Sequence, residues 1–193
     1  MTEPFEPWTA VLPVVDVLEI LDVPYYVSGS LASSYSGIAR ATQDADLVAD
    51  LSSRHVAPFI SALQDRYYLS PDRVRSAIGR RKSFNLIHLE TSFKIDVFVL
   101  TPDAFAQAAM KRRLPFELSE SGRVLDFCAP EDIVLHKLCW FDRGNRLSDR
   151  QWSDLQGVLR LQRECLDLDH LRIWAENLGL PDLLEKALEE AGF

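Results

Sequence analysis

The chain has 193 residues, which fits one large domain or two small ones and allows a sizeable hydrophobic core. It is 47% apolar and 26% charged, close to the average globular protein. Its 29 acidic and 21 basic residues give a formal net charge of -8. This charge argues against a sequence-independent nucleic-acid binder, because such binding needs a net basic footprint. A local basic patch stays open.

Cysteine spacing and hydropathy favour a cytoplasmic protein without a membrane partner. Cys128, Cys139 and Cys165 are odd in number and widely spaced, which argues against a disulfide framework or a zinc site. Their apolar surroundings predict buried free thiols. The acidic first residues lack the basic-then-apolar order of a signal peptide. No uninterrupted apolar run approaches the ~18 residues that a membrane span needs.

The first part of the chain alternates between helical and strand patterns. Helical spacing predicts a helix over 12–22, which a proline then ends. A short β-type run over 25–27 meets Ser28-Gly29-Ser30, which predicts a strand, a tight turn and a helix. Apolar and acidic residues alternate from Asp44 to Leu51, which predicts a strand with carboxylates on one face.

The later elements follow from similar signals. The patterns predict a helix over 53–66, a hairpin of strands over 84–89 and 93–100, a helix over 102–113 opening on Pro102, and a strand over 123–127. From Pro130 on the pattern is only helical, with a capping box formed by Ser148 and Gln151 and two more helices over 167–177 and 181–191. We expect an α/β unit over 1–128 and a helical lobe over 129–193, packed as one body.

Three aspartates on the strand-type runs are the most informative feature. Asp44 and Asp46 are two residues apart, so a strand projects both side chains from one face. Asp96 lies between apolar neighbours, where a solitary carboxylate is costly unless something pairs with it. Three neighbouring carboxylates would repel one another, and a hard divalent cation would relieve that repulsion. The pattern predicts a site for magnesium ions that could clamp a phosphoryl displacement.

Gly29 and Ser30 end the first predicted strand. Glycine permits a close backbone approach, and the N–H groups at the start of the next helix favour an anion. The pattern therefore predicts that a phosphate chain rests here while the acids hold its metal.

The sequence at this point resembles the DNA polymerase beta-like nucleotidyltransferase superfamily. The resemblance rests on Gly29-Ser30, thirteen residues, Asp44-Ala45-Asp46, and a third acid in Ile95-Asp96-Val97. The run from Arg40 to Val48 and a later helix opening Pro130-Glu131-Asp132 are similar to those of small prokaryotic members, among them toxins of type IV toxin–antitoxin systems.

The resemblance implies an α+β fold, with a small mixed sheet flanked by helices and followed by a C-terminal helical unit. It also implies transfer of a nucleoside monophosphate from a nucleoside triphosphate to a hydroxyl, with pyrophosphate leaving. Asp44, Asp46 and Asp96 would hold two Mg2+ ions, with Mn2+ as an alternative. The residues implied in holding the triphosphate or its loop are Gly29, Ser30, Arg40, Thr42 and Lys137.

Other side chains keep two interpretations. Lys137 lies in an apolar sector of its helix, so it either reaches solvent or extends into the site. A basic stretch from Arg73 to Lys82 is either a solvated face or a patch for triphosphate or a nucleic-acid acceptor. We expect the aromatic residues to pack as core between the lobes and His136 to be structural. These aromatic residues are Trp140, Phe141, Trp152 and Trp174.

Three functions are compatible with the sequence. The first is a magnesium-dependent nucleotidyltransferase whose acceptor is a transfer RNA, a protein or a small molecule. The second is a catalytically inactive nucleotide- or partner-binding module of the same fold, since Gln151-Trp152-Ser153-Asp154 replaces a Lys-Asp run common in similar proteins. The third is the toxin of a toxin–antitoxin pair, with an antitoxin as partner.

Overall fold

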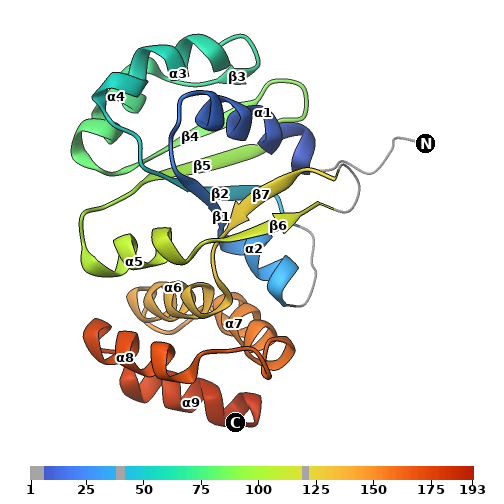
Figure 1. The fold of residues 1–193 in the computed structure, drawn as a ribbon, viewed down its shortest axis with the longest axis vertical. Helices are drawn as coiled ribbons and strands as arrows, with labels where there is room; N and C mark the ends of the chain where they lie inside the picture. The colour runs from blue at the N-terminus through green and yellow to red at the C-terminus, as the bar shows by residue number, and fades with distance from the viewer. Residues whose placement is uncertain (1–6, 38–41, 119–121) are drawn as a thin grey trace.

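The computed structural model describes residues 7–37, 42–118 and 122–193. A mixed sheet of seven strands runs through these ranges in the order β3-β4-β5-β2-β1-β7-β6 (Figure 1). The strands are β1 Tyr25–Ser28, β2 Asp44–Ala49, β3 Tyr67–Tyr68, β4 Ser83–His88, β5 Lys94–Val99, β6 Leu114–Glu117 and β7 Val124–Phe127. The pairs β2–β5 and β1–β7 are parallel, and the other neighbouring pairs are antiparallel.

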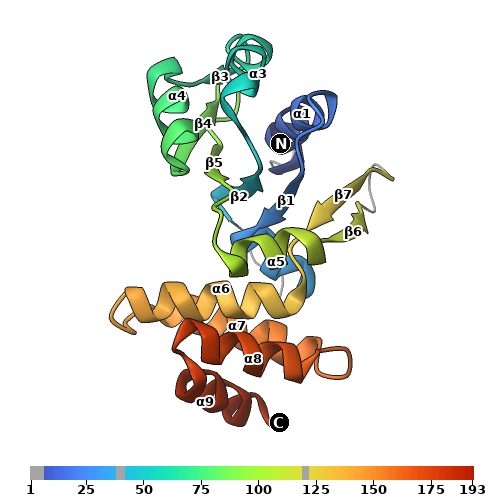
Figure 2. The same ribbon diagram turned by 60° about the vertical axis from the view of Figure 1, so that its left-hand side comes forward.

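Helices cover the sheet at both ends of the molecule. They are α1 Pro7–Ile20, α2 Gly29–Ser36, α3 Val56–Leu63, α4 Pro71–Arg80, α5 Ala104–Arg112, α6 Pro130–Arg143, α7 Asp149–Leu161, α8 Leu168–Leu178 and α9 Pro181–Ala191. The last four stack below the sheet, while α3 and α4 lie at the opposite end (Figures 1 and 2). This architecture confirms the predicted α+β class, a mixed sheet flanked by helices and followed by a helical unit.

Local side-chain contacts move several predicted boundaries. The predicted hairpin is present as the antiparallel pair β4–β5. The helix expected to open on Pro102 begins at Ala104, because the Asp103 carboxylate accepts a hydrogen bond from the Ala106 N–H and caps it. The capping box at Ser148 is only half formed. The Ser148 hydroxyl accepts from the Gln151 N–H, but the Gln151 side chain accepts from Lys137 instead.

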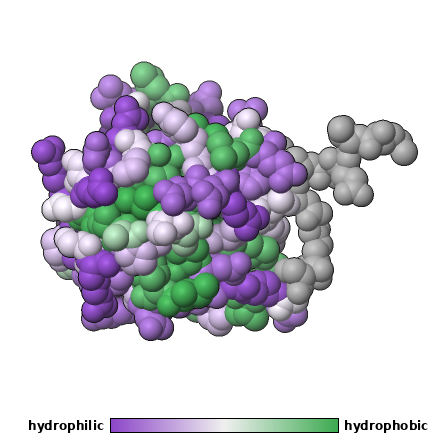
Figure 3. Space-filling model, turned by 90° about the horizontal axis from the view of Figure 1, so that it is seen from above, coloured by the Kyte–Doolittle hydropathy of each residue, from purple (hydrophilic) through white to green (hydrophobic). Residues whose placement is uncertain are grey.

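Strand alternation separates the core from the site. In β2 and β5 the buried positions, such as Leu47 and Ile95, face the hydrophobic core, and the alternate positions face the other way. From the α3–α4 end the surface shows hydrophilic side chains with separate apolar patches between them (Figure 3). Within the described ranges, no helix is long and apolar enough to cross a membrane.

The three cysteines are free thiols, as predicted. Cys128 is buried and Cys139 is partly buried. Cys165 is exposed, so the predicted burial was wrong there, because the residue lies in the turn between α7 and α8.

Candidate active site

Two neighbouring parallel strands bring the three aspartates to one face of the sheet. In the register of β2 and β5, Asp46 lies directly beside Asp96 and Asp44 lies beside Lys94. Because side chains two residues apart in a strand share a face, Asp44 follows Asp46 along the same face. The structure therefore places the carboxylates that the sequence singled out on two neighbouring strands, through a pairing of residues fifty positions apart in the chain.

Gly29 lies directly against Asp46. β1 pairs with β2 so that Ser28 faces Asp46, and Gly29 follows as the first residue of α2 with a φ of +61°. A Cβ atom at Gly29 would lie 1.7 Å from the Asp46 Oδ2 atom. The position thus needs glycine both for its left-handed backbone and for the close approach of the carboxylate.

The carboxylates perturb one another. Burial first, and then the charges of Asp44 and Asp96, raise the pKa of Asp46 to about 6. Lys94 opposes this effect from the same sheet face, with its Nζ atom 2.6 Å from Asp96 Oδ2 and 3.8 Å from Asp44 Oδ2. Its hydrogen bond to Asp96 in turn raises the pKa of Lys94. A cation is therefore already shared between two of the three acids.

Lys137 enters the site from α6. Its side chain is buried, and its Nζ atom donates to Asp154 Oδ2 at 2.9 Å and to Gln151 Oε1 at 3.2 Å, both on α7. Its charge also favours the ionised form of Asp46. The ammonium therefore does not reach solvent but is held by α7 beside the cavity, and its contact with a triphosphate stays a prediction. The segment 151–154 provides the groups that hold the ammonium.

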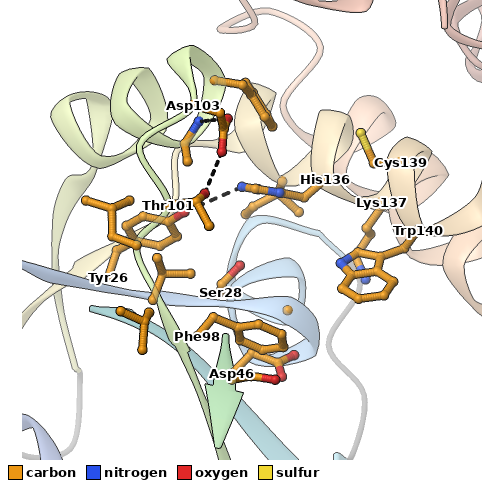
Figure 4. Close-up of a pocket in the computed structure, with 18 of the residues that line it drawn as sticks. Tyr26, Ser28, Asp46, Phe98, Thr101, Asp103, His136, Lys137, Cys139 and Trp140 are labelled. Atoms are coloured by element: carbon orange, nitrogen blue, oxygen red, sulfur yellow. Dashed lines mark hydrogen bonds between the residues drawn. The ribbon is translucent and has the colours of Figure 1, made fainter. Parts of the chain in front are cut away.

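A cavity of about 560 Å³ is lined by Gly29, Ser30, Asp46 and Lys137. Asp46 and Phe98 extend into it from the sheet, and Lys137 and Trp140 extend from α6 on its other side (Figure 4). Trp140 is 51% exposed, so the prediction that it packs as core was wrong. The other three predicted core aromatics do pack against or within the core, at positions Phe141, Trp152 and Trp174.

The remaining predicted residues have separate positions. The Thr42 hydroxyl lies within hydrogen-bond distance of the Asp44 carbonyl, 3.0 Å, and of its Oδ1 atom, 3.1 Å. Ser30 lines the cavity one residue after Gly29. His136 packs on Phe105, and burial lowers its pKa to about 4, which fits a structural ring. Arg40 lies outside the described residues.

The donor set fits a hard divalent cation by its chemistry. Asp44, Asp46 and Asp96 offer only carboxylate oxygens on one face, the ligand type that magnesium prefers. In the part of the chain that the structure describes, no three His, Cys, Asp or Glu side chains are drawn together as a metal-binding group. The Lys94 ammonium pairs with two of the acids instead.

The fold is that of solved nucleotidyltransferases. ANT(2″)-Ia in complex with adenylyl-2″-tobramycin matches with a TM-score of 0.53 at 11% identity, over 88% of this chain and 95% of that one. The lincomycin-bound lincosamide antibiotic adenylyltransferase LnuA matches with a TM-score of 0.50 at 15% identity, over 79% and 96%. A nucleotidyltransferase-like protein from Paracoccidioides brasiliensis matches with 0.50 at 16%, over 93% and 91%.

Sequence comparison adds no relative. No protein-family model matches the chain, and no curated protein matches it significantly. At identities of 11–16%, the structural matches show a shared fold alone.

Sequence reasoning missed Lys94 and Phe98. Both are two residues from Asp96, so the alternation that placed Asp44 with Asp46 also placed them on the acidic face. Asp154 had no such signal, because its contact with Lys137 depends on how two helices pack.

Proposed function

We propose that the protein transfers a nucleoside monophosphate from a nucleoside triphosphate to a hydroxyl acceptor and releases pyrophosphate. One observation carries the proposal: Asp46 and Asp96 lie side by side in register, and Gly29 lies against Asp46 at a cavity of about 560 Å³. The shared fold of nucleotidyltransferases supports it.

The triphosphate would bind between α2 and α6. Gly29 and Ser30 present the N-terminus of α2, whose N–H groups favour phosphate. Lys137 approaches from the other side with its ammonium fixed by Asp154 and Gln151. Since the lysine is held by α7 before any ligand binds, it costs little reorganisation when a phosphate arrives.

The reaction balances as a single displacement. The acceptor hydroxyl oxygen forms a bond to the α-phosphorus, and the bond from that phosphorus to the α–β bridging oxygen breaks. Pyrophosphate leaves with the electron pair, and Asp96 accepts the hydroxyl proton. Divalent metal held by Asp44, Asp46 and Asp96 would supply charge neutralisation and Lewis acidity at the phosphate oxygens.

Labelled nucleoside triphosphates incubated with the protein, Mg2+ or Mn2+ and a cell extract test the proposal. We expect transfer of label and release of pyrophosphate, both lost in Asp46→Asn and Asp96→Asn. Asp126→Asn is the matched control, because Asp126 is a partly exposed strand aspartate paired with Arg113 away from the cavity. Transfer that persists in Asp46→Asn would contradict the proposal.

A second function, a nucleotide-binding module without catalysis, is favoured by one contact. Lys94 Nζ lies 2.6 Å from Asp96, where its charge neutralises an acid that the reaction needs. Pyrophosphate release separates the two functions, since both bind triphosphate. Binding measured by calorimetry without pyrophosphate release in any metal would support the module.

The toxin hypothesis differs from the proposed function only in its biological role, because its chemistry is the same nucleotidyl transfer. It rests on the sequence resemblance around Asp44 and Asp46. Growth arrest on expression of the protein, lost in Asp46→Ala, would support this hypothesis and the expected antitoxin partner. Normal growth of expressing cells would contradict it.

A further inference from the structure

Helix α4 carries an unbalanced group of cations in an acidic protein. The helix and its C-terminal turn hold five basic residues and no acid from Arg73 to Lys82. The one acidic residue of α4 is Asp72, in its first turn. Asp72 pairs with Arg75, and Asp50 pairs with Arg81. The exposed Arg73, Arg80 and Lys82 have no ion-pair partner within the described ranges.

Two of these cations share one stripe of α4. Arg73 and Arg80 are seven residues apart, which is about two turns, so they project from the same side about 10 Å apart along the axis. Both side chains are exposed, beside the buried residues Val74, Ala77 and Ile78 that pack on the core. Arg75 projects from a different side of the helix.

The stripe runs between two pockets. Arg73, near the N-terminus of α4, lines a pocket of about 270 Å³ with Tyr68 and Asn85. Arg81 and Lys82, directly after its C-terminus, line the cavity that contains Asp46. A ten-residue helix is about 15 Å long, so the cations mark a short path from one pocket to the other.

The smaller pocket is also next to the third acid. Asn85 pairs with Asp96 in the β4–β5 register, and β3 covers β4 only opposite Ile87 and His88. Among the described strands, the first half of β4 therefore has no partner on the side away from β5. A ligand in this pocket lies one strand away from Asp96, on the side of the acids away from Gly29.

We propose that the α4 stripe, with the pocket of Tyr68, Arg73 and Asn85, binds a single nucleic-acid strand as the acceptor. The inference rests on the proposed function and names its acceptor class. The phosphates lie along Arg73 and Arg80, a base stacks on the ring of Tyr68, which is 66% exposed, and the terminal hydroxyl reaches Asp96.

The combination of groups favours a nucleic acid over an acidic peptide. A peptide carboxylate would use the arginines, but it would leave the exposed tyrosine ring and the Asn85 amide unused. A nucleotide offers phosphate, an aromatic face and hydrogen-bonding base edges together. A polycationic acceptor is disfavoured, because Lys137 and the basic residues Arg81, Lys82 and Arg143 also line the larger cavity.

Fluorescence polarisation with labelled RNA and DNA oligonucleotides, measured without triphosphate, tests the surface. Arg73→Gln/Arg80→Gln should weaken binding at least about tenfold and reduce the salt slope of log K by about 1.4, since each lost single-strand phosphate contact contributes about 0.7. Arg75→Gln removes one charge from another side of α4, and we expect less than about a threefold change. Circular dichroism checks that all variants fold.

Three outcomes overturn the inference. Equal losses in the double variant and in Arg75→Gln would mean general attraction rather than a defined stripe. Displacement of the oligonucleotide by polyglutamate at equal concentration would assign the surface to an acidic protein. Absence of binding by the wild type at low salt would also overturn it. The binding assay contains no triphosphate, so its result does not depend on the proposed function. Absence of pyrophosphate release in a separate assay with oligonucleotide, triphosphate and metal would instead contradict the proposed function.

Discussion

Gly29 and Asp46 are packed so closely that only a glycine leaves room for the carboxylate. A Cβ atom at Gly29 would lie 1.7 Å from Asp46 Oδ2 and 2.6 Å from its Cγ, in a backbone with a φ of +61°. The carboxylate is the partly buried acid whose pKa is raised, so it cannot move aside without changing the sheet face it shares with Asp96.

Gly29→Ala should therefore abolish nucleotidyl transfer and lower the free energy of unfolding by about 2–4 kcal/mol, from backbone strain and the clash. Gly179→Ala is the control, because Gly179 has a φ of +73° and an added methyl group would meet nothing within 4 Å. It should cost about 1–2 kcal/mol from strain alone and keep full activity. Urea unfolding and pyrophosphate release check both. Equal costs for the two variants would contradict the close approach.

Asp46 destabilises the metal-free protein at neutral pH. Its folded-state pKa of about 6 exceeds the ordinary 3.8, so its contribution to stability is present below about pH 4 and is lost as the pH rises through 6. In a chelator, Asp46→Asn should raise the free energy of unfolding at pH 7.5 by about 1–2 kcal/mol and change it little at pH 4. The same variant should be inactive. A gain of equal size at both pH values would contradict the perturbed carboxylate.

Much of this site follows from strand periodicity. Alternation along the sequence is enough to put Asp44 and Asp46 on one face, and Gly29-Ser30 marks the turn beside them. The register between β2 and β5 could not be predicted from the sequence. No local sequence pattern determines which residue of one strand pairs with Asp46 in the other. β6 was missed for a related reason, since three of its four residues are exposed and no apolar alternation marks it.

Helix packing was the least predictable part. Helical periodicity places Lys137 inside an apolar sector of its helix. Only the packing of α7 on α6 shows that Asp154 and Gln151 accept hydrogen bonds from its ammonium group. Trp140 lies beside that sector and was assigned to the core, yet the helices that follow leave it at the cavity. Both outcomes depend on contacts between segments that sequence periodicity does not report.

Lys94 should compete with divalent metal at the acids. Its ammonium lies 2.6 Å from Asp96 and 3.8 Å from Asp44, so a cation bound there must displace it. Lys94→Met should lower the Mg2+ concentration that gives half of the thermal stabilisation by about three- to tenfold, since two carboxylates lose a competing charge. Differential scanning fluorimetry against Mg2+ measures this shift without any turnover. Lys111→Met, at the C-terminal end of α5, is the control. An unchanged midpoint would show that Lys94 and the metal use separate positions.

The buried pair of Lys137 and Asp154 has a structural and a proposed catalytic part, and a double-mutant cycle separates them. Their side chains are 5% and 9% exposed, so removing either charge alone leaves the other buried. Lys137→Met and Asp154→Leu should each cost about 2–4 kcal/mol of stability, whereas the double variant should recover most of that cost. Activity should not recover with it, because the cavity has lost the ammonium proposed to face the triphosphate. Urea unfolding and pyrophosphate release of the four proteins complete the cycle. Full activity in the stable double variant would leave Lys137 a purely structural residue.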